Sequence, residues 1–291
     1  MCRIGVTAAT EEEIYARVGL PFIPPELREG NGEIERAEKG ELAALVSLDR
    51  IRGAFHVHST YSDGRARLEQ TFARAVELGW EYVGISDHSQ AARYANGLSP
   101  ARLEEQWAEI ESLRPRFPSL TVFRGTEVDI FADGTVDYDD DVLAKFDFVI
   151  ASPHGAFQLP EAEQTARLIR AVSNPRVTML GHVTGRRLLE RSGLRADLPA
   201  VLAAAARSGC IVETNGSPYR LELDWRDGET ARALGVTTSI NPDAHDLPAL
   251  EHVRFGVAVA RKAGFPAESV LNTGTASAVS ARLAELRARA S

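Results

Sequence analysis

Two histidines and an aspartate stand close together in the segment G-A-F-H-V-H-S-T-Y-S-D-G, residues 53–64. His56 and His58 are separated by one residue, so in an extended strand both side chains lie on the same face. Asp63 follows beyond the turn that ends the strand. Two imidazoles and a carboxylate directed at one place suit Zn, Mn or Fe. Ordinary strand histidines with a turn aspartate would give the same segment, so the rest of the chain has to decide between the two interpretations.

Short apolar segments alternate with amphipathic ones along the rest of the chain. This alternation predicts a parallel sheet covered by helices. Seven strands favour a closed or nearly closed barrel over an open sheet, and no G-x-G-x-x-G motif follows the first strand to support a dinucleotide-binding fold. The predicted strands are 53–58, 82–88, 121–128, 146–152, 177–182, 210–216 and 236–245. The predicted helices lie between Leu68 and Gly79, from Ser99 to Leu113, and over 161–172, 198–208, 225–234, 248–263 and 277–289.

Six of the seven histidines stand at or just after the C-terminal end of a predicted strand, and several carboxylates join them. The C-terminal ends of the strands form the face on which α/β barrels build active sites. Unrelated core histidines would not share one end of the barrel, so this placement favours a site. The nine candidate ligands are His56, His58, Asp63, His88, Glu127, His154, His182, Asp243 and His245.

Nine ligands exceed the four that one zinc ion usually takes, so three divalent ions with shared carboxylates fit the number best. We expect His56 and His58 to serve one ion and Asp63 to reach a different one. Asp87 alternates away from the site and is expected to support a ligand, while His252, in a predicted helix, is expected to be a surface or packing residue. The candidate catalytic residues are Glu127, His154, Asp243 and His245.

Closely spaced divalent ions suit an in-line displacement at phosphorus by metal-activated hydroxide. The sequence contains no G-x-S-x-G, C-x-x-C or Walker motif, so a covalent Ser or Cys mechanism is not favoured. A phosphate also needs cationic donors, and an arginine fork matches phosphoryl oxygens. Arginines in the loops after strands two, five and six are candidates, although each would equally well form a surface salt bridge. The substrate-binding candidates are Arg93, Arg186 and Arg220, followed by Asn215 and Ser89.

The composition is that of an ordinary globular protein, with 291 residues, 44% hydrophobic and 25% charged. The net charge of −8 disfavours strong non-specific DNA binding, though not local contacts with nucleic acid. No apolar run is long enough to cross a membrane, and the N-terminus lacks the features of a signal peptide. Cys2 and Cys210 are the only cysteines, so no disulfide framework is expected. We therefore expect a cytoplasmic protein, of unknown oligomeric state.

Residues 1–52 read differently from the barrel segment. T-E-E-E-I-Y-A-R-V, residues 10–18, predicts a short helix capped by Thr10, with Glu13 at the capping-box position. A proline-rich connector follows at 21–30, and 34–48 is expected to hold a helical turn or two. This segment is too small to form a core of its own. We therefore divide the chain into an N-terminal arm or linker, residues 1–52, and a barrel domain, residues 53–291.

Several motifs together resemble those of the PHP (polymerase and histidinol phosphatase) phosphoesterases, over about residues 53–285. They are H-V-H-S-T-Y-S-D-G, G-I-S-D-H-S, G-T-E-V-D-I, A-S-P-H, L-G-H-V-T-G-R, E-T-N-G-S-P-Y-R and N-P-D-A-H. R-Y-A-N-G-L, E-V-D-I-F-A-D-G and S-P-Y-R-L-E-L are most similar to the PHP domain attached to bacterial family X DNA polymerases. The resemblance implies a distorted (β/α)7 TIM-like barrel with a trinuclear site of Zn, Mn or Fe, held by the same nine ligands.

The resemblance also implies an activity. It points to a phosphoesterase acting on DNA 3′ ends, single-stranded DNA or nucleotides, of the 3′–5′ exonuclease or 3′-phosphatase type, with a role in DNA repair. The arm resembles the end of a family X polymerase thumb, but the polymerase aspartates and helix-hairpin-helix modules are absent, so we expect no polymerase activity. The chain is then either a truncated polymerase or a free-standing PHP protein that keeps a remnant. One alternative is a small-molecule phosphatase of the histidinol-phosphatase type. Another is a non-catalytic interaction barrel in a repair assembly, against which the complete ligand set argues.

Overall fold

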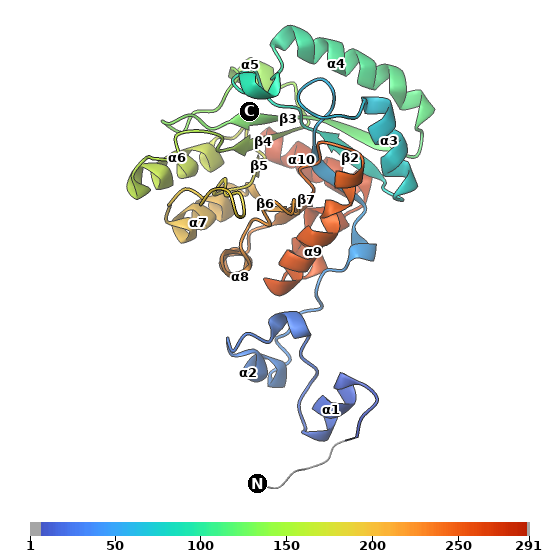
Figure 1. The fold of residues 1–291 in the computed structure, drawn as a ribbon, viewed down its shortest axis with the longest axis vertical. Helices are drawn as coiled ribbons and strands as arrows, with labels where there is room; N and C mark the ends of the chain where they lie inside the picture. Colours follow the sequence, from blue (N-terminus) through green and yellow to red (C-terminus); the bar gives the residue numbers. More distant parts are fainter. Residues whose placement is uncertain (1–6, 290–291) are drawn as a thin grey trace.

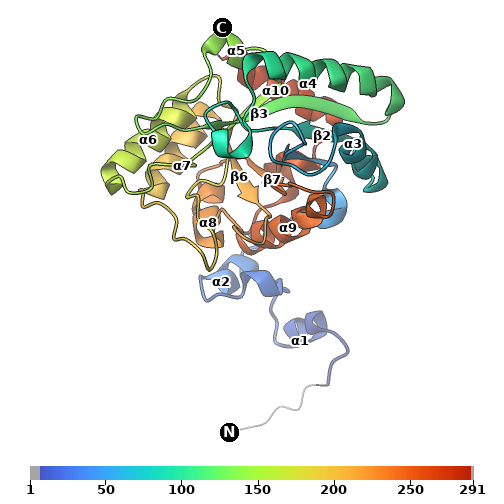
Figure 2. The ribbon, with the colours of Figure 1, turned by 45° about the horizontal axis from the view of Figure 1, so that its top comes forward.

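The seven predicted strands form a single parallel sheet that curls into a nearly closed barrel. The computed structural model describes residues 7–289, and the strands follow one another in the order β1-β2-β3-β4-β5-β6-β7. Helices cover the outside of the sheet, as Figures 1 and 2 show. The strands are β1 Gly53–Val57, β2 Tyr82–Ile85, β3 Thr121–Asp129, β4 Phe148–Ser152, β5 Met179–Leu180, β6 Ile211–Asn215 and β7 Thr238–Asn241.

The predicted helices are confirmed with small shifts of their ends. One short helix, α5 Asp140–Leu143, was not predicted, and the segment 248–263 divides into a 3-10 helix, η5 Pro248–His252, and α9. The other helices are α1 Glu11–Arg17, α2 Glu33–Glu38, α3 Leu68–Glu77, α4 Pro100–Leu113, α6 Glu161–Ser173, α7 Leu198–Ser208, α8 Trp225–Ala233, α9 Val253–Lys262 and α10 Ala276–Ala288. No helix within residues 7–289 is both long enough and apolar enough to cross a bilayer.

Two strands, β5 and β7, are shorter than the sequence predicts. Beside β5, the hydroxyl of Thr178 bonds to both the N–H and the C=O of Val149, at 2.8 and 2.9 Å, and the N–H of Thr178 donates to the same carbonyl at 3.1 Å. β7 ends at Asn241 because Pro242 has no N–H to donate, and Asp243 then takes a left-handed conformation with φ 50°. The backbone after β7 therefore leaves the sheet early.

The barrel closes between its first and last strands. Val57 pairs with Ala244, the N–H of His58 donates to the carbonyl of Ala244 at 2.9 Å, and the N–H of Ala244 donates to the carbonyl of His56 at 3.1 Å. The register of β1 shifts between Ala54 and Val57, and His56 has φ 58°. Our prediction of a regular strand at His56 was therefore wrong. The bulge, which increases local twist, still brings the rings of His56 and His58 to 5.3 Å from each other.

The opposite end of the barrel is filled by apolar side chains and closed by α10. Phe55, Phe148 and Ile211 lie near the starts of their strands and belong to the same buried cluster as Leu283 and Leu286 of α10. This packing seals the N-terminal ends of the strands. The C-terminal ends are thereby left as the open face.

Over residues 7–52, the arm has one small apolar cluster of its own, centred on Ile23, Leu27 and Ala37. It is fixed to the barrel at Val46, which is fully buried and whose N–H donates to the carbonyl of Phe265 at 3.0 Å. Figures 1 and 2 show α1 and α2 projecting away from the sheet. In α1 the Thr10 hydroxyl accepts from the N–H of Glu13, as predicted.

The two cysteines fall in different parts of the chain. Cys210 is buried and free. Cys2 lies outside the described residues.

Candidate metal centre

All nine predicted ligands come together at the open mouth of the barrel. The mouth encloses a cavity of about 760 Å³. His56 and His58 lie beneath the cavity and are almost completely buried. The other seven line it: Asp63, His88, Glu127, His154, His182, Asp243 and His245.

Glu127 stands at the centre of the cluster. It lies on β3, the longest strand, and is buried. Its two carboxylate oxygens each face histidines from different strands, as a carboxylate shared between metals would. Oε1 lies 2.9 Å from His182 Nε2, 3.1 Å from His56 Nε2 and 3.3 Å from His154 Nε2, while Oε2 lies 3.0 Å from His88 Nδ1 and 3.6 Å from His58 Nε2.

Four overlapping groups of side chains could each hold a metal ion, with their donor atoms within 4.8 Å of one another. We name two of them. The inner group is His56, His182 and Asp243, and the outer group is His58, Asp63, His88 and His245. The two remaining groups contain Glu127, once with His56 and His58 and once with His88 and His154. Asp63 thus falls in a different group from His56, whereas His58 belongs to two groups.

The buried donor atoms fit a metal better than they fit one another. Several ring nitrogens are shielded from water and have no hydrogen-bond partner among the described residues. The same is true of Oε1 of Glu127. Leaving a buried polar atom unpaired costs about 1–3 kcal/mol. A set of imidazoles and carboxylates with free lone pairs is the donor set that Zn, Mn and Fe take in proteins. The unpaired nitrogens are His56 Nε2, His58 Nδ1 and Nε2, His88 Nδ1 and His182 Nδ1.

Burial and neighbouring charges divide the titration behaviour of the cluster. Burial alone lowers the pKa of His154, but Glu127 and Asp129 outweigh this effect and raise the pKa to about 9. Burial also lowers the pKa of His245, but the carboxylates of Asp63 and Asp243 outweigh this effect and raise the pKa to about 9. Both imidazoles therefore hold a proton that a bound metal would have to displace.

Other members of the cluster are already in the form that binds metal. Burial lowers the pKa of His182 to about 4, and the positive charge of Arg220 adds to this effect. Burial also lowers the pKa of His88 to about 4. Burial opposes ionisation of Glu127 and Asp243, yet the surrounding histidines hold the pKa of each carboxyl well below its usual range. Neutral imidazoles and ionised carboxylates thus face each other before any metal binds.

Two acids that sequence reasoning missed hold the histidine rings in place. Glu213, wholly buried on β6, lies 2.5 Å from the ring Nδ1 of His56 and accepts from the backbone N–H of His182 at 2.7 Å. Asp129, at the end of β3, lies 2.6 Å from His154 Nδ1. Carboxylates behind metal-binding histidines fix the ring orientation and tautomer. An acid inside the apolar strand C-I-V-E-T-N was the available signal for Glu213, and Asp129, two residues after Glu127, shares its face of the strand.

Arg167 of α6 braces the loops that carry Asp129 and His154. Its guanidinium is buried and donates to the carbonyl oxygens of Phe131 at 2.9 Å and Gly155 at 3.0 Å, and also to that of Ile130. The side chain of Asp87 points away from the cluster and bonds to no proposed ligand, but it fixes the segment that follows His58. Its buried carboxylate accepts from the N–H of Ser59 at 2.7 Å and from the Ser59 hydroxyl at 2.6 Å.

The predicted phosphate-binding arginines differ in their position. Arg220 lines the cavity and its Nε donates to Asp243 Oδ2 at 3.0 Å. Arg186 instead turns to the backbone, donating to the carbonyls of Arg220, at 2.8 Å, and Leu221, and it does not line the cavity. Arg93 is exposed on η3 Arg93–Ala95 and also lies outside the cavity lining.

The remaining polar candidates are buried below the mouth. Asn215 donates to Glu213 at 3.1 Å and to Asp243 at 3.2 Å, so it aligns acids of the cluster. Ser89 is buried, with its hydroxyl unpaired among the described residues. His252, expected to be a surface or packing residue, lines the cavity near its rim. Helical periodicity did not reveal this position because η5 turns there toward the mouth.

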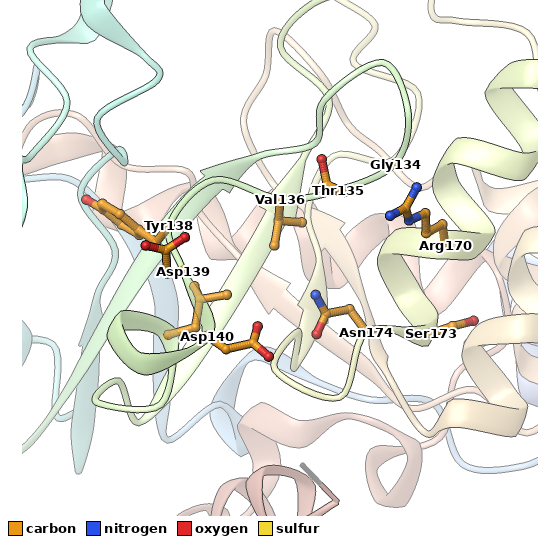
Figure 3. A pocket seen from close by; sticks show the side chains of 10 residues that line it. Gly134, Thr135, Val136, Tyr138, Asp139, Asp140, Arg170, Ser173 and Asn174 are labelled. Carbon is orange, nitrogen blue, oxygen red and sulfur yellow. The ribbon is translucent and has the colours of Figure 1, made fainter.

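A second cavity, of about 610 Å³, lies on the outer wall between α5 and α6 (Figure 3). Its charged side chains are Asp139, Asp140 and Arg170. Arg170 donates to the backbone carbonyl of Asp133 at 3.1 Å. None of the nine clustered donors lines this cavity, so we place the reactive site at the barrel mouth.

Comparison with known proteins identifies the family of the chain. The model of the PHP domain matches residues 54–201. The DNA polymerase/3′-5′ exonuclease PolX of Bacillus subtilis is 40% identical over 266 residues, which cover 91% of this chain and 46% of that protein. The chain thus spans about half the length of this relative. A protein named probable phosphatase in Thermoanaerobacter sp. is 26% identical, covering 75% of this chain and 89% of its own length.

Solved structures support the fold. The crystal structure of histidinol phosphate phosphatase from Lactococcus lactis, complexed with Zn, L-histidinol and phosphate, aligns with a TM-score of 0.54 and 18% identity. It covers 74% of this chain and 94% of its own. Together with the PHP match and the relatives named as phosphatases and as an exonuclease, the convergent donors at the barrel mouth show that the chain belongs to the PHP family and is a metal-dependent phosphoesterase, a hydrolase of phosphoester bonds.

Proposed function

We propose that this protein hydrolyses phosphoester bonds at the 3′ ends of DNA, as a 3′–5′ exonuclease or 3′-phosphatase without polymerase activity. The observation that carries the proposal is the set of nine convergent donors in a chain that is 40% identical to a protein named as a 3′-5′ exonuclease. The arm at 1–52 then corresponds to a linker and the barrel at 53–291 to the hydrolase.

Three divalent ions, Zn, Mn or Fe, are the proposed cofactors. The inner group would hold one, the outer group another, and the groups that contain Glu127 the third. Such ions supply Lewis acidity, which activates water and offsets the charge of the phosphoryl oxygens. The proposed ligands are His56, His58, Asp63, His88, Glu127, His154, His182, Asp243 and His245.

The residues around the ions have distinct proposed roles. Arg220 faces the cavity and provides a fixed positive charge for a phosphoryl oxygen. His154, backed by Asp129 at 2.6 Å, is suited to hold a proton for the leaving oxygen whenever it is not bound to metal. Asp243 aligns Arg220 through their contact of 3.0 Å. Arg186 orders the Arg220 loop through two backbone carbonyls, so its role is to position rather than to bind phosphate.

A substrate screen in Mn²⁺ tests the proposal. The purified chain is offered single-stranded DNA, 3′-phosphorylated DNA and small phosphomonoesters, and released nucleotide and phosphate are quantified. We expect release from DNA that disappears on chelation and in His182→Ala, with a lower metal content by elemental analysis. His252→Ala, a histidine at the same mouth outside the four groups, should keep its metal. Unchanged DNA hydrolysis by His182→Ala would contradict the site.

A small-molecule phosphatase is the second candidate. The net charge of −8 and the matching relatives named as probable phosphatases favour it. The same screen separates the two functions by the ratio of kcat/KM for DNA to kcat/KM for phosphomonoesters such as histidinol phosphate.

A further inference from the structure

Two exposed aromatic rings stand on opposite sides of the barrel mouth. Tyr94 lies on η3 after β2, and Tyr219 lies in the loop after β6. Around the barrel, β3, β4 and β5 separate these strands in one direction, and β1 and β7 separate them in the other. Both tyrosines line the cavity that contains the metal donors. A substrate with its phosphate at the cluster would therefore pass between the two rings.

These rings are unusually free for tyrosines. Tyr94 is 72% exposed and Tyr219 is 60% exposed. The hydroxyls of Tyr61 and Tyr138, in contrast, donate to Glu109 at 2.7 Å and to the carbonyl of Leu98. Within residues 7–289 neither rim tyrosine has a side-chain hydrogen bond of this kind, so both rings are open to a ligand in the cavity.

Each ring is nevertheless held in place. The ring of Tyr94 lies 6.2 Å from that of His88 and 6.3 Å from that of His154, so it overhangs the cluster. The carbonyl of Tyr219 accepts from the N–H of Leu188 at 2.7 Å, which joins the loops after β5 and β6. The guanidinium of Arg187 lies 5.7 Å from the centre of the Tyr219 ring. A flat face fixed beside a cation is the arrangement on which single-stranded nucleic acids stack.

Arginines stand at the mouth beside its carboxylates, although the whole chain is acidic. Arg65, Arg187 and Arg220 all line the cavity. Burial lowers the pKa of the neighbouring Arg191, and the positive charges of Arg220 and Arg187 lower it further. These guanidinium groups repel one another, so an anionic chain between them would be stabilised.

We propose that Tyr94 and Tyr219 are base-stacking residues, whose rings contact the bases of the nucleosides on either side of the scissile phosphate. This inference rests on the proposed function, and it assigns substrate selection to the rim rather than to the metal cluster. The phosphate contacts position the strand, and the rings distinguish a polynucleotide from a small phosphomonoester. Because every base offers a flat face, the preference for DNA would be independent of sequence.

The test compares oligonucleotides with and without bases. The full chain in Mn²⁺ hydrolyses an oligonucleotide and the same oligonucleotide with tetrahydrofuran abasic residues at its last two positions. The measured ratio is kcat/KM for the oligonucleotide with bases divided by kcat/KM for the abasic one. For Tyr94→Leu and Tyr219→Leu, we expect this ratio to be about 5- to 150-fold lower than in the native chain. Tyr→Phe at either position should keep the native ratio, because stacking requires only the ring. Phe131→Leu, which alters an exposed aromatic residue outside the mouth cavity, is the matched control.

A second readout does not depend on turnover. An oligonucleotide with 2-aminopurine at its 3′ end should lose fluorescence when it binds the native protein in the presence of a chelator, which prevents hydrolysis. The loss of fluorescence should be smaller with the Tyr→Leu variants. An unchanged ratio and unchanged quenching in both Leu variants would overturn the stacking assignment alone. Loss of the ratio in the Phe variants would also overturn it, in favour of a role for the hydroxyls. A native chain that hydrolyses p-nitrophenyl phosphate but neither oligonucleotide would overturn the proposed function and this assignment together.

Discussion

The inner and outer groups of the metal centre are built in different ways. The inner side chains His56, His182 and Asp243 are at most 7% exposed, and Glu213 contacts the ring of His56 and the backbone N–H of His182. In the outer group, Asp63 is 33% and His245 39% exposed at the side chain. The ring of His245 lies 3.1 Å from the backbone carbonyl of Asp243 and 3.4 Å from the carboxylate of Asp63, and it stacks on the ring of His58 at 4.2 Å.

This difference separates two tasks within one site. The inner donors lie on or directly beside strands and are fixed by a buried carboxylate, so they are organised before a metal arrives. Of the outer donors, Asp63 and His245 lie in loops that water can reach, so their metal should exchange more readily and their geometry should adapt to the substrate. We therefore expect the metal ions of this enzyme to differ in affinity according to these two environments.

Replacing Glu127, whose carboxylate faces histidines of both the inner and the outer group, should have the largest effect on activity. Glu127→Gln removes a charge that lies within 3.6 Å of five histidines. We expect kcat/KM to fall by about 1,000-fold and metal to be lost from both groups, as measured by elemental analysis. The exposed Glu251→Gln, which alters a surface ion pair with Arg74, serves as the control. Retention of all metal in Glu127→Gln would refute the shared role of this carboxylate.

Loss of the inner support should affect one side only. Glu213→Gln keeps the shape but weakens the contacts to His56 and His182, so the affinity of the tightest ion should fall by about 10- to 100-fold. Isothermal titration of the metal-free protein measures this affinity. Glu222→Gln is a matched control, because Glu222 is another fully buried acid, one that bonds to the N–H of Thr184 and to no histidine. Equal losses in both variants would mean that burial, and not ring support, is responsible.

A change in the outer group should be milder. Asp63→Asn weakens a partly exposed donor, so the weakest ion should bind about tenfold less tightly, and the inner ion should be unaffected. Stepwise removal of metal with increasing chelator, followed by elemental analysis, would show the outer ion leaving first in the native chain and still earlier in this variant. Removal of the inner ion first would reverse the assignment of the two environments.

The stability of the metal-free protein should depend on pH in opposite ways for two histidines of the cluster, His245 and His182. His245 has a pKa raised to about 9 from the usual 6.5, so its stabilising effect is complete below pH 6.5 and is lost as pH rises through 9. His182 has a pKa lowered to about 4, so stability is lost as pH falls from 6.5 toward 4. Thermal unfolding in chelator should show a maximum near pH 6.5.

Single variants separate the two limbs of this pH profile. His245→Gln should flatten the alkaline limb and His182→Gln the acidic one. The alkaline change will be the smaller, because His245 is partly exposed and water screens its partners. A pH profile that His182→Gln leaves unaltered on the acidic side would contradict the described environment.

The sequence was most informative where chemistry coincides with the ends of strands. Each of the nine donors belongs to a type that binds metal and follows or ends an apolar segment, so topology alone brought them to one face. Glu213 was not predicted because a single acid within a strand gives no sequence pattern that indicates its partner, His56. Arg186 was predicted to bind phosphate because its position in a loop does not reveal that its guanidinium donates to the carbonyls of Arg220 and Leu221.

The backbone itself was the other limit. The bulge at His56 and the left-handed conformation of Asp243 depend on contacts between β1 and the segment after β7. Residues so distant in sequence give no local signal, and neither residue type demands such a conformation.

The seam between β1 and β7 has a consequence for the order in which the molecule assembles. The hydrogen bond from the N–H of Phe55 to Asn241 Oδ1 at this seam joins residues 186 positions apart. Pairings across such separations require the greatest loss of chain freedom and form slowly. His56 and Asp243 flank this junction, so the inner group comes into existence only when the beginning and end of the barrel have met. During biosynthesis, a partly emerged chain would therefore have no complete inner site, and tight metal uptake would mark a barrel that has finished folding.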